Sequence, residues 1–99
     1  MARVLYLGDE VTAAGFRLAG VETRVTHLTD AAEALRAALE SELDCVLLSA
    51  RLVTGVPPSL LERVAEAVEP LFAIVPDVRG RNASQDLARD VRDALGIEA

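Results

Sequence analysis

Four short apolar runs alternate with four segments in which apolar residues recur every three or four positions, and this alternation constrains the fold most. The runs cover residues 3–7, 23–28, 44–49 and 71–75. Runs of this length that are bounded by Gly, Pro or Asp predict buried strands. Strands that alternate with helices predict an α/β fold, here a doubly wound four-stranded parallel sheet with helices on both faces. Right-handed crossovers give the strand order 2-1-3-4.

Capping residues place the first two helices. Asp9 is a suitable N-cap for a helix over residues 11–18, and Gly20 suits the left-handed position that ends it. Asp30 and Glu33 have the spacing of a capping box, which predicts a second helix directly behind them. The apolar stripe of this second helix is Ala31, Ala34, Leu35, Ala38 and Leu39.

Prolines and a second capping box place the last two helices. Pro58 suits the first turn of a third helix, and Pro70 ends that helix. Its predicted apolar stripe is Leu61, Val64, Ala65 and Val68. After a polar loop at 77–81, Asn82 with Gln85 predicts a C-terminal helix over residues 82–96. This last helix carries an apolar stripe of Leu87, Val91 and Leu95.

Length and composition bound the class of protein. Ninety-nine residues, 52% of them hydrophobic, predict a single domain over 1–99, with a core at 1–76 and the C-terminal helix. No apolar run approaches the roughly 18 to 20 residues that span a bilayer. We expect no signal peptide and, since Cys45 is the only cysteine, no internal disulfide. These features predict a soluble cytoplasmic protein without membrane insertion.

The charge of the chain disfavours nucleic acid as a partner. The net charge is −6, whereas nucleic-acid affinity needs clustered positive charge. Anionic lipid is disfavoured for the same reason. All ten basic residues are Arg, so every mechanism that requires a lysine is excluded, including the phosphate-binding P-loop.

The turn after the first strand is the natural ligand site of such a sheet. Gly8 and Gly15 are too few for a dinucleotide fingerprint, and Asp9 and Glu10 stand where phosphate would lie. Phosphoacceptor receiver domains resemble this fold and hold Mg²⁺ with acids at this turn, but they also need an aspartate that ends strand three, where this chain has Ser49. We therefore interpret Asp9 as a helix cap and Glu10 as a charge at the positive helix end.

The remaining chemistry-bearing residues are isolated. Cys45 lies inside the third strand and is interpreted as a small buried hydrophobe. His27 has no nucleophile or acid that sequence can assign to it, and Arg79 and Arg81 are interpreted as a solvated loop. We expect no catalytic residue, no metal site and no cofactor, which favours an interaction module.

Two features indicate a partner surface. Residues 15–20 carry Phe16, one of three aromatics, which we expect to anchor the first helix to the sheet. Gly15 and Ala19 are small and allow close backbone approach to the sheet or to a neighbour. The second feature is the narrow stripe of the C-terminal helix, which suits packing against another helix. The same stripe could instead cover one face of the sheet, and periodicity leaves both readings open.

The segment 15–20, Gly-Phe-Arg-Leu-Ala-Gly, resembles the signature of the family of V/A-type ATPase F subunits. Val75-Pro76 is similar to the Ile-Pro element of that family, and residues 95–97, Leu-Gly-Ile, are similar to its closing pattern. The resemblance covers essentially the whole chain, with the hexapeptide as its specific part. The chain departs from the family at Ala50, where relatives carry an acidic turn, and in its very short tail.

The resemblance implies a non-enzymatic rotor component of the central stalk, peripheral to the membrane on its cytoplasmic side. It would bind the coiled coil of the D subunit, stiffen the shaft and couple ATP synthesis or hydrolysis to ion transport. Its further partners would be the connector between shaft and membrane ring and, transiently, the A/B catalytic head. The expected partner-binding residues are Arg17, Leu18, Leu87, Val91 and Leu95. The alternatives are a receiver-like regulatory domain without a phosphoacceptor and, third, a small-molecule or nucleotide-binding enzyme.

Overall fold

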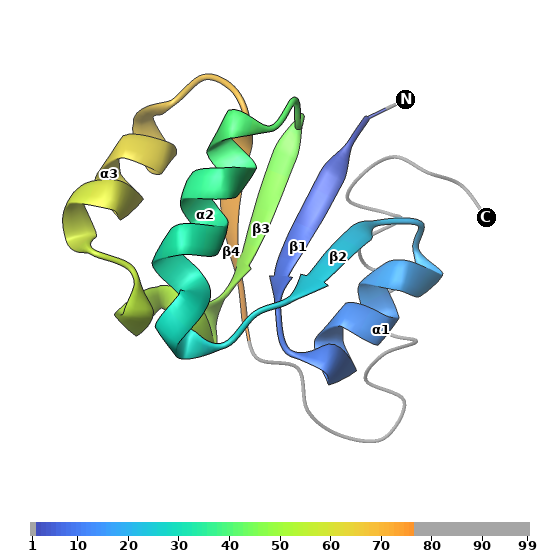
Figure 1. Ribbon diagram of the computed structural model, residues 1–99. Coiled ribbons are helices and arrows are strands. Elements are labelled where there is room, and N and C mark those ends of the chain that lie inside the picture. Colours follow the sequence, from blue (N-terminus) through green and yellow to red (C-terminus); the bar gives the residue numbers. More distant parts are fainter. Residues whose placement is uncertain (1, 77–99) are drawn as a thin grey trace.

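The computed structural model describes residues 2–76, which form a four-stranded parallel sheet with helices on both faces (Figure 1). The strands are β1 (Val4–Gly8), β2 (Glu22–Val25), β3 (Cys45–Ser49) and β4 (Leu71–Val75). Their order is β2-β1-β3-β4, which confirms the predicted order and fold class. The predicted C-terminal helix at 82–96 and the loop at 77–81 lie outside the described residues.

Three α-helices and two 3-10 turns connect the strands. The helices are α1 (Glu10–Leu18), α2 (Ala31–Glu40) and α3 (Pro58–Glu66), and the turns are η1 (Leu28–Asp30) and η2 (Ala50–Gly55). Helices α2 and α3 cover one face of the sheet, and α1 covers the opposite face (Figure 1). Asp9 caps α1 and Gly20 follows it with φ of 86°, both as predicted.

The face under α2 and α3 is packed with aliphatic side chains. Within residues 2–76, the buried residues of this core are Leu7, Ala31, Ala34, Leu35, Ala38, Leu43, Val46, Leu48, Leu52, Val56, Leu60 and Val64. Four of these belong to the predicted stripe of α2, whose fifth member Leu39 is half-buried against them. Small Ala side chains on α2 let this helix approach the sheet closely.

The face under α1 contains the aromatic core. Within the described residues 2–76, its buried side chains are Val4, Tyr6, Ala13, Phe16, Ala19 and Val21. The rings of Tyr6 and Phe16 stack with centroids 4.5 Å apart, an arrangement worth about 0.5–1.5 kcal/mol beyond the area it buries. Phe16 thus anchors α1 to the sheet, as the sequence predicts.

The entry into α2 differs from the prediction. Strand β2 ends at Val25 rather than at residue 28, because Leu28–Asp30 forms the 3-10 turn η1. Asp30 is already helical, with φ of −104° and ψ of 0°, and its side chain makes no capping hydrogen bond. The predicted capping box is therefore wrong, since a capping side chain needs an extended backbone to reach back to the free N–H groups.

The predicted stripe of α3 is also wrong in part. Leu60 and Val64 are its buried residues, Leu61 is half-buried, and Ala65 is exposed. Val68 is 85% exposed because the helix ends at Glu66, before it could carry Val68 to the core. The buried side of α3 therefore contains Leu60, which the predicted stripe omits, and it ends before Val68, which the predicted stripe includes.

Candidate functional site

The carboxyl ends of β1 and β3, where a doubly wound sheet binds ligands, are joined by a small polar cluster. Asp9 has an extended backbone and accepts a hydrogen bond from the Thr12 backbone N–H at 3.0 Å. The Tyr6 hydroxyl donates to the other carboxylate oxygen of Asp9 at 3.3 Å. Through these two hydrogen bonds Asp9 links the start of α1 to Tyr6 of β1.

The protonation states of this cluster suit a structural role. Partial burial opposes ionisation of Asp9, but hydrogen bonds from Thr12 and Tyr6 outweigh it and lower the pKa of the carboxyl. Burial raises the pKa of the Tyr6 phenol, and the Asp9 carboxylate adds to that rise. At neutral pH the cluster therefore pairs a charged acceptor with a neutral donor.

The Tyr6 phenol fills the space between the last residues of these strands. A Cβ atom placed on Gly8 would lie 2.1 Å from the Tyr6 hydroxyl oxygen and 2.9 Å from the Ser49 Cβ atom. Tyr6 and Ser49 are themselves buried, at 1% and 3% exposure. The phenol is thus buried between Gly8 of β1 and Ser49 of β3.

Within residues 2–76, His, Cys, Asp and Glu side chains do not gather in threes where they could hold a metal ion. Ser49 stands at the position that a receiver domain fills with its phosphoacceptor, and its hydroxyl accepts from the Arg51 backbone N–H at 3.3 Å. The arrangement of Asp9, Tyr6 and Ser49 can orient a helix, but it offers neither a nucleophile next to a base nor an open coordination position.

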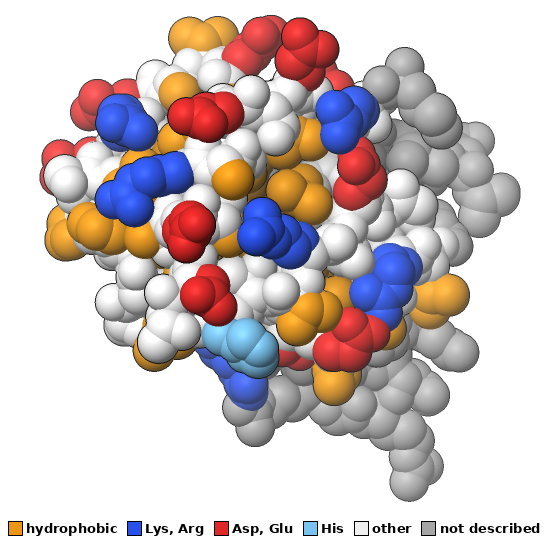
Figure 2. All heavy atoms as spheres, in the orientation of Figure 1, with side chains coloured by type: hydrophobic (Ala, Val, Ile, Leu, Met, Phe, Trp, Pro, Cys, Tyr) orange, Lys and Arg blue, Asp and Glu red, His pale blue; other side chains and the backbone are white. Residues whose placement is uncertain are grey.

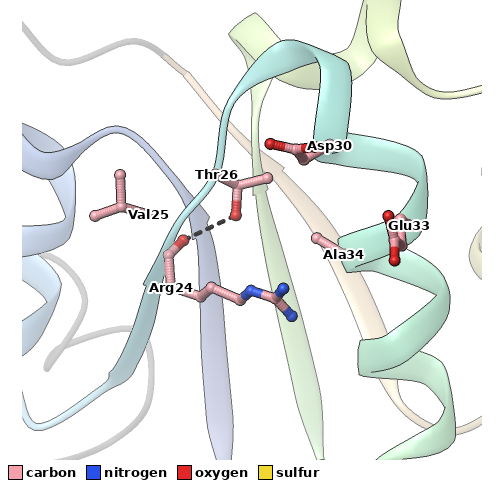
Figure 3. Close-up of a pocket in the computed structure, with 6 residues that line it drawn as sticks. All are labelled: Arg24, Val25, Thr26, Asp30, Glu33 and Ala34. Carbon is pink, nitrogen blue, oxygen red and sulfur yellow. Dashed lines mark hydrogen bonds between the residues drawn. The ribbon is translucent and has the colours of Figure 1, made fainter.

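A shallow pocket lies further along the same edge, between β2 and the start of α2 (Figure 3). The side chain of Arg24 extends toward α2, and Asp30 of η1 and Glu33 of α2 stand at the rim. The Thr26 hydroxyl donates to the Arg24 carbonyl at 3.0 Å and closes the strand end. At about 130 Å³ the pocket is well below the roughly 300–1,000 Å³ of ordinary ligand sites.

The hexapeptide at 15–20 divides into an inner and an outer part. Gly15, Phe16 and Ala19 are buried against the sheet. Arg17 and Leu18 are exposed, Leu18 by 56%. The predicted pair of contact residues therefore stands on the surface at the end of α1.

Arg17 is held in place by its neighbours. Its guanidinium forms an ion pair with Glu10 in the first turn of the same helix, and it donates to the Thr23 hydroxyl of β2 at 3.0 Å. Glu10 thus orients Arg17 in addition to standing at the positive end of the helix. Because these side chains are about half exposed, the pair fixes a position more than it adds stability.

The other candidate residues stay apart. Cys45 is half-buried, and burial raises the pKa of its thiol, which makes it a poor nucleophile. His27 is exposed directly before η1. Leu87, Val91, Leu95, Arg79 and Arg81 lie outside the described residues.

Sequence reasoning missed the role of Tyr6 in the polar cluster. A single Tyr in an otherwise aliphatic strand, two residues before Gly8, was the available signal. Glycine leaves room beside a bulky neighbour, and a buried phenol needs a hydrogen-bond acceptor such as Asp9.

The charges of the described surface are mixed. Acidic and basic side chains are interspersed over the face in Figure 2. None of the helices within residues 2–76 is both long and apolar enough to cross a bilayer. The face in view offers contacts of mixed character rather than the basic stripe of a nucleic-acid binder.

Comparison with known proteins gives a consistent result. Residues 4–93 match the family described as ATP synthase (F/14-kDa) subunit. The F subunit of the A-type ATP synthase of Pyrococcus furiosus is 30% identical over 104 residues, an alignment that covers 97% of this chain and 96% of the relative. The crystal structure of the F subunit of the V-type ATP synthase from Archaeoglobus fulgidus superposes with a TM-score of 0.65 at 27% identity, covering 75% of this chain and 96% of that one.

Proposed function

The chain belongs to the family of the ATP synthase (F/14-kDa) subunit, and we propose that it is the non-catalytic F subunit in the central stalk of a V/A-type ATP synthase. The match over residues 4–93 carries this proposal, because it spans every described strand and helix. In this role the chain binds the D-subunit coiled coil, stiffens the shaft and helps to couple ATP synthesis or hydrolysis to ion transport.

The packed ligand edge supports a role without chemistry of its own. Tyr6 fills the space between the ends of β1 and β3, and Asp9 is engaged as a helix cap. A sheet whose ligand edge is closed by side chains is a rigid platform. We infer that its work is to present surfaces to other subunits.

The first of these surfaces is the outer end of α1. Arg17 is held by Glu10 and Thr23, so its charge is positioned before binding. Leu18 beside it is 56% exposed and offers an apolar contact. We propose that these two residues, with the stripe of Leu87, Val91 and Leu95, contact the shaft.

Binding to the purified D subunit tests this proposal. Leu18→Asp and Leu95→Asp each place a charge in the proposed apolar interface, which should cost about 2 to 4 kcal/mol and weaken binding roughly 30-fold or more. Ala37→Asp on the exposed side of α2 is the matched control and should bind as the unchanged chain does. Calorimetry gives the affinities, and circular dichroism verifies that each variant is folded.

Failure of the unchanged chain to bind the D subunit would reject the proposed function. Full binding by both Asp variants would reject only the assigned surface. The connector subunit and the A/B head are the further partners that we propose, the connector as a component that rotates with the chain and the head as a transient contact.

A further inference from the structure

The two edges of the sheet differ in the side chains that they carry. Edge strand β2 reads Glu-Thr-Arg-Val, so it bears a charge of each sign. Edge strand β4 reads Leu-Phe-Ala-Ile-Val and bears none. Charged side chains are a common protection of sheet edges against pairing with another chain, so β4 is the less protected edge.

The backbone of β4 has hydrogen-bonding groups directed away from the sheet. The Leu71 N–H donates to the Asp44 carbonyl at 3.0 Å, so Leu71 faces β3 with its backbone groups. Because successive residues of a strand alternate, Ala73 and Val75 also face β3, whereas Phe72 and Ile74 face outward. In the described sheet β4 pairs with β3 alone, which leaves the N–H and C=O groups of Phe72 and Ile74 at the open edge.

Apolar side chains accompany these groups. Leu71 is 65% exposed, Ile74 is 49% exposed, and Val68 just before the strand is 85% exposed. Pro70 and Pro76 bracket β4 and have no N–H to donate. An added strand is therefore limited to about five residues, since proline interrupts a hydrogen-bonded ladder.

A carboxylate-lined hollow lies at the amino end of this edge, where the loops that lead into β3 and β4 meet. It has a volume of about 290 Å³, and its acidic lining residues are Glu42, Asp44 and Glu69. The Arg3 backbone N–H donates to one Asp44 carboxylate oxygen at 2.6 Å. The Arg3 guanidinium pairs with the Glu22 carboxylate and also donates to the Glu42 backbone carbonyl at 3.3 Å, so it leaves the carboxylates of Glu42 and Glu69 to other partners. Figure 2 shows acidic side chains gathered at this upper end of the molecule.

We propose that the β4 edge binds an extended segment of a neighbouring subunit, which joins the sheet as a fifth strand. The segment is apolar at alternate positions, and an Arg or Lys at one end enters the hollow between Glu42 and Glu69. The inference rests on the proposed function in that the neighbour is a component of the same assembly. A second copy of the chain is a poorer occupant, since two copies with a net charge of −6 each repel one another.

The strength of this contact indicates which subunit provides the segment. Four main-chain groups and an ion pair make a lasting attachment, which a stalk cannot form with the stationary head while turning past it. The segment therefore belongs to a component that rotates with the chain. Arg17 and Leu18, the described part of the proposed shaft surface, lie on the side of β2 and away from β4, so the connector between shaft and membrane ring is the occupant to which we commit.

Amide hydrogen exchange followed by NMR tests this assignment without altering the chain. The complex of the chain with the D subunit is measured before and after addition of the purified connector. The Phe72 and Ile74 amides should exchange at least about tenfold more slowly once the connector is bound, as expected for newly formed hydrogen bonds. The Thr23 and Val25 amides, which face outward from β2, are the internal control and should not change with the connector.

Each outcome decides between the occupants. Unchanged exchange at Phe72 and Ile74 in the three-part complex rejects the inference. Protection that appears with the D subunit alone assigns the edge to the shaft, and protection that grows with the concentration of the free chain assigns it to a second copy; both overturn the proposal. Absence of binding to the D subunit would reject the proposed function instead.

A charge test addresses the hollow separately. The double variant Glu42→Gln with Glu69→Gln should weaken connector binding about tenfold at low salt, and the loss should shrink at high salt because exposed charges are screened. Glu33→Gln with Glu40→Gln, on the surface of α2, is the control with the same change of net charge. Equal binding by both double variants would exclude a cation in the hollow.

Discussion

The two faces of the sheet are packed with different kinds of side chain. Among residues 2–76, twelve buried aliphatic residues pack under α2 and α3, and Ala supplies three of the positions on α2. In the same part of the chain, six buried residues pack under α1, and two of them are the stacked rings of Tyr6 and Phe16. The first core spreads its stabilisation over many similar contacts, whereas the second concentrates it in one aromatic pair.

The face under α1 also carries the hexapeptide on which the resemblance to the family of F subunits rests. Phe16 belongs to the hexapeptide at 15–20, and Tyr6 closes the ligand edge and binds Asp9. Arg17 and Leu18 stand on the outer side of the same helix. Packing of this face, the Asp9 cap and the described part of the proposed shaft surface therefore all involve α1.

Truncation of Phe16 is the strongest challenge to this contrast. Phe16→Ala should lower the free energy of unfolding by about 3–5 kcal/mol, because it removes the partner of Tyr6 from the aromatic core. Leu35→Ala on the opposite face should cost about 2–5 kcal/mol, as is usual for a buried leucine. Urea unfolding measures both values.

The near-ultraviolet circular dichroism of Tyr6, the only tyrosine, separates the two variants. Phe16→Ala should weaken this signal, while Leu35→Ala should leave it intact. A tyrosine signal that changes equally in both variants would show that the two faces are coupled and would remove the contrast.

A methyl group at Gly8 tests the closed ligand edge. Gly8→Ala places a carbon 2.1 Å from the buried Tyr6 hydroxyl oxygen, so the ring must shift. We expect a loss of about 1–3 kcal/mol, the usual range for overpacking. Thermal or urea unfolding measures the loss, and a shifted Tyr6 signal in the NMR spectrum reports the movement of the ring.

Gly20→Asn is the comparison for this prediction, because nothing lies within 4 Å of an added Cβ atom there and Asn tolerates its φ of 86°. It should cost less than Gly8→Ala. If the two costs are reversed, the strand ends are looser than the structure indicates.

The pH dependence of the Asp9 cap is the smallest effect. The pKa of Asp9 is lowered below its ordinary value of 3.8 in the folded chain. The carboxylate therefore contributes stability above that ordinary value, and the contribution is lost as the pH falls through the folded pKa. Asp9→Asn keeps an oxygen that can cap α1 but cannot titrate.

At pH 7 Asp9→Asn should be less stable than the unchanged chain by about 0.3–1 kcal/mol, the usual value of a charge at a helix N-terminus. The difference should disappear when urea midpoints are compared at a pH below the folded pKa. A difference that is constant with pH would show that the charge of Asp9 does not act on the folded state.

The elements that sequence predicts best are those whose signal is local. The predicted bounds of Leu71–Val75 match the observed ones because Pro70 and Pro76 bracket an unbroken apolar run. The cap at Asp9 and the turn at Gly20 follow from backbone requirements of single residues. The resemblance at 15–20 and the family match agree on what the chain is related to.

The elements that sequence misplaced depend on contacts across the fold. The capping-box spacing at Asp30 is present, but η1 packs on η2, where Gly55 allows the Leu28 carbonyl to approach within 2.4 Å of an added Cβ position. The sequence also shows that Val68 is apolar without showing that α3 ends at Glu66. A spacing rule describes what a residue can do, whereas neighbouring elements select what it does.

The alternation of strands and helices, the strand order, the two caps of α1 and the inward side of its hexapeptide followed from the sequence alone. These features depend on backbone geometry and apolar periodicity, which act over a few residues. Only the tertiary structure revealed that Tyr6 closes the ligand edge, that Arg17 is held by Glu10 and Thr23, and that β4 is an uncharged open edge of the described sheet. Such features arise where segments that are distant in the chain come into contact, and a pattern of neighbouring residues does not show which distant segments will meet.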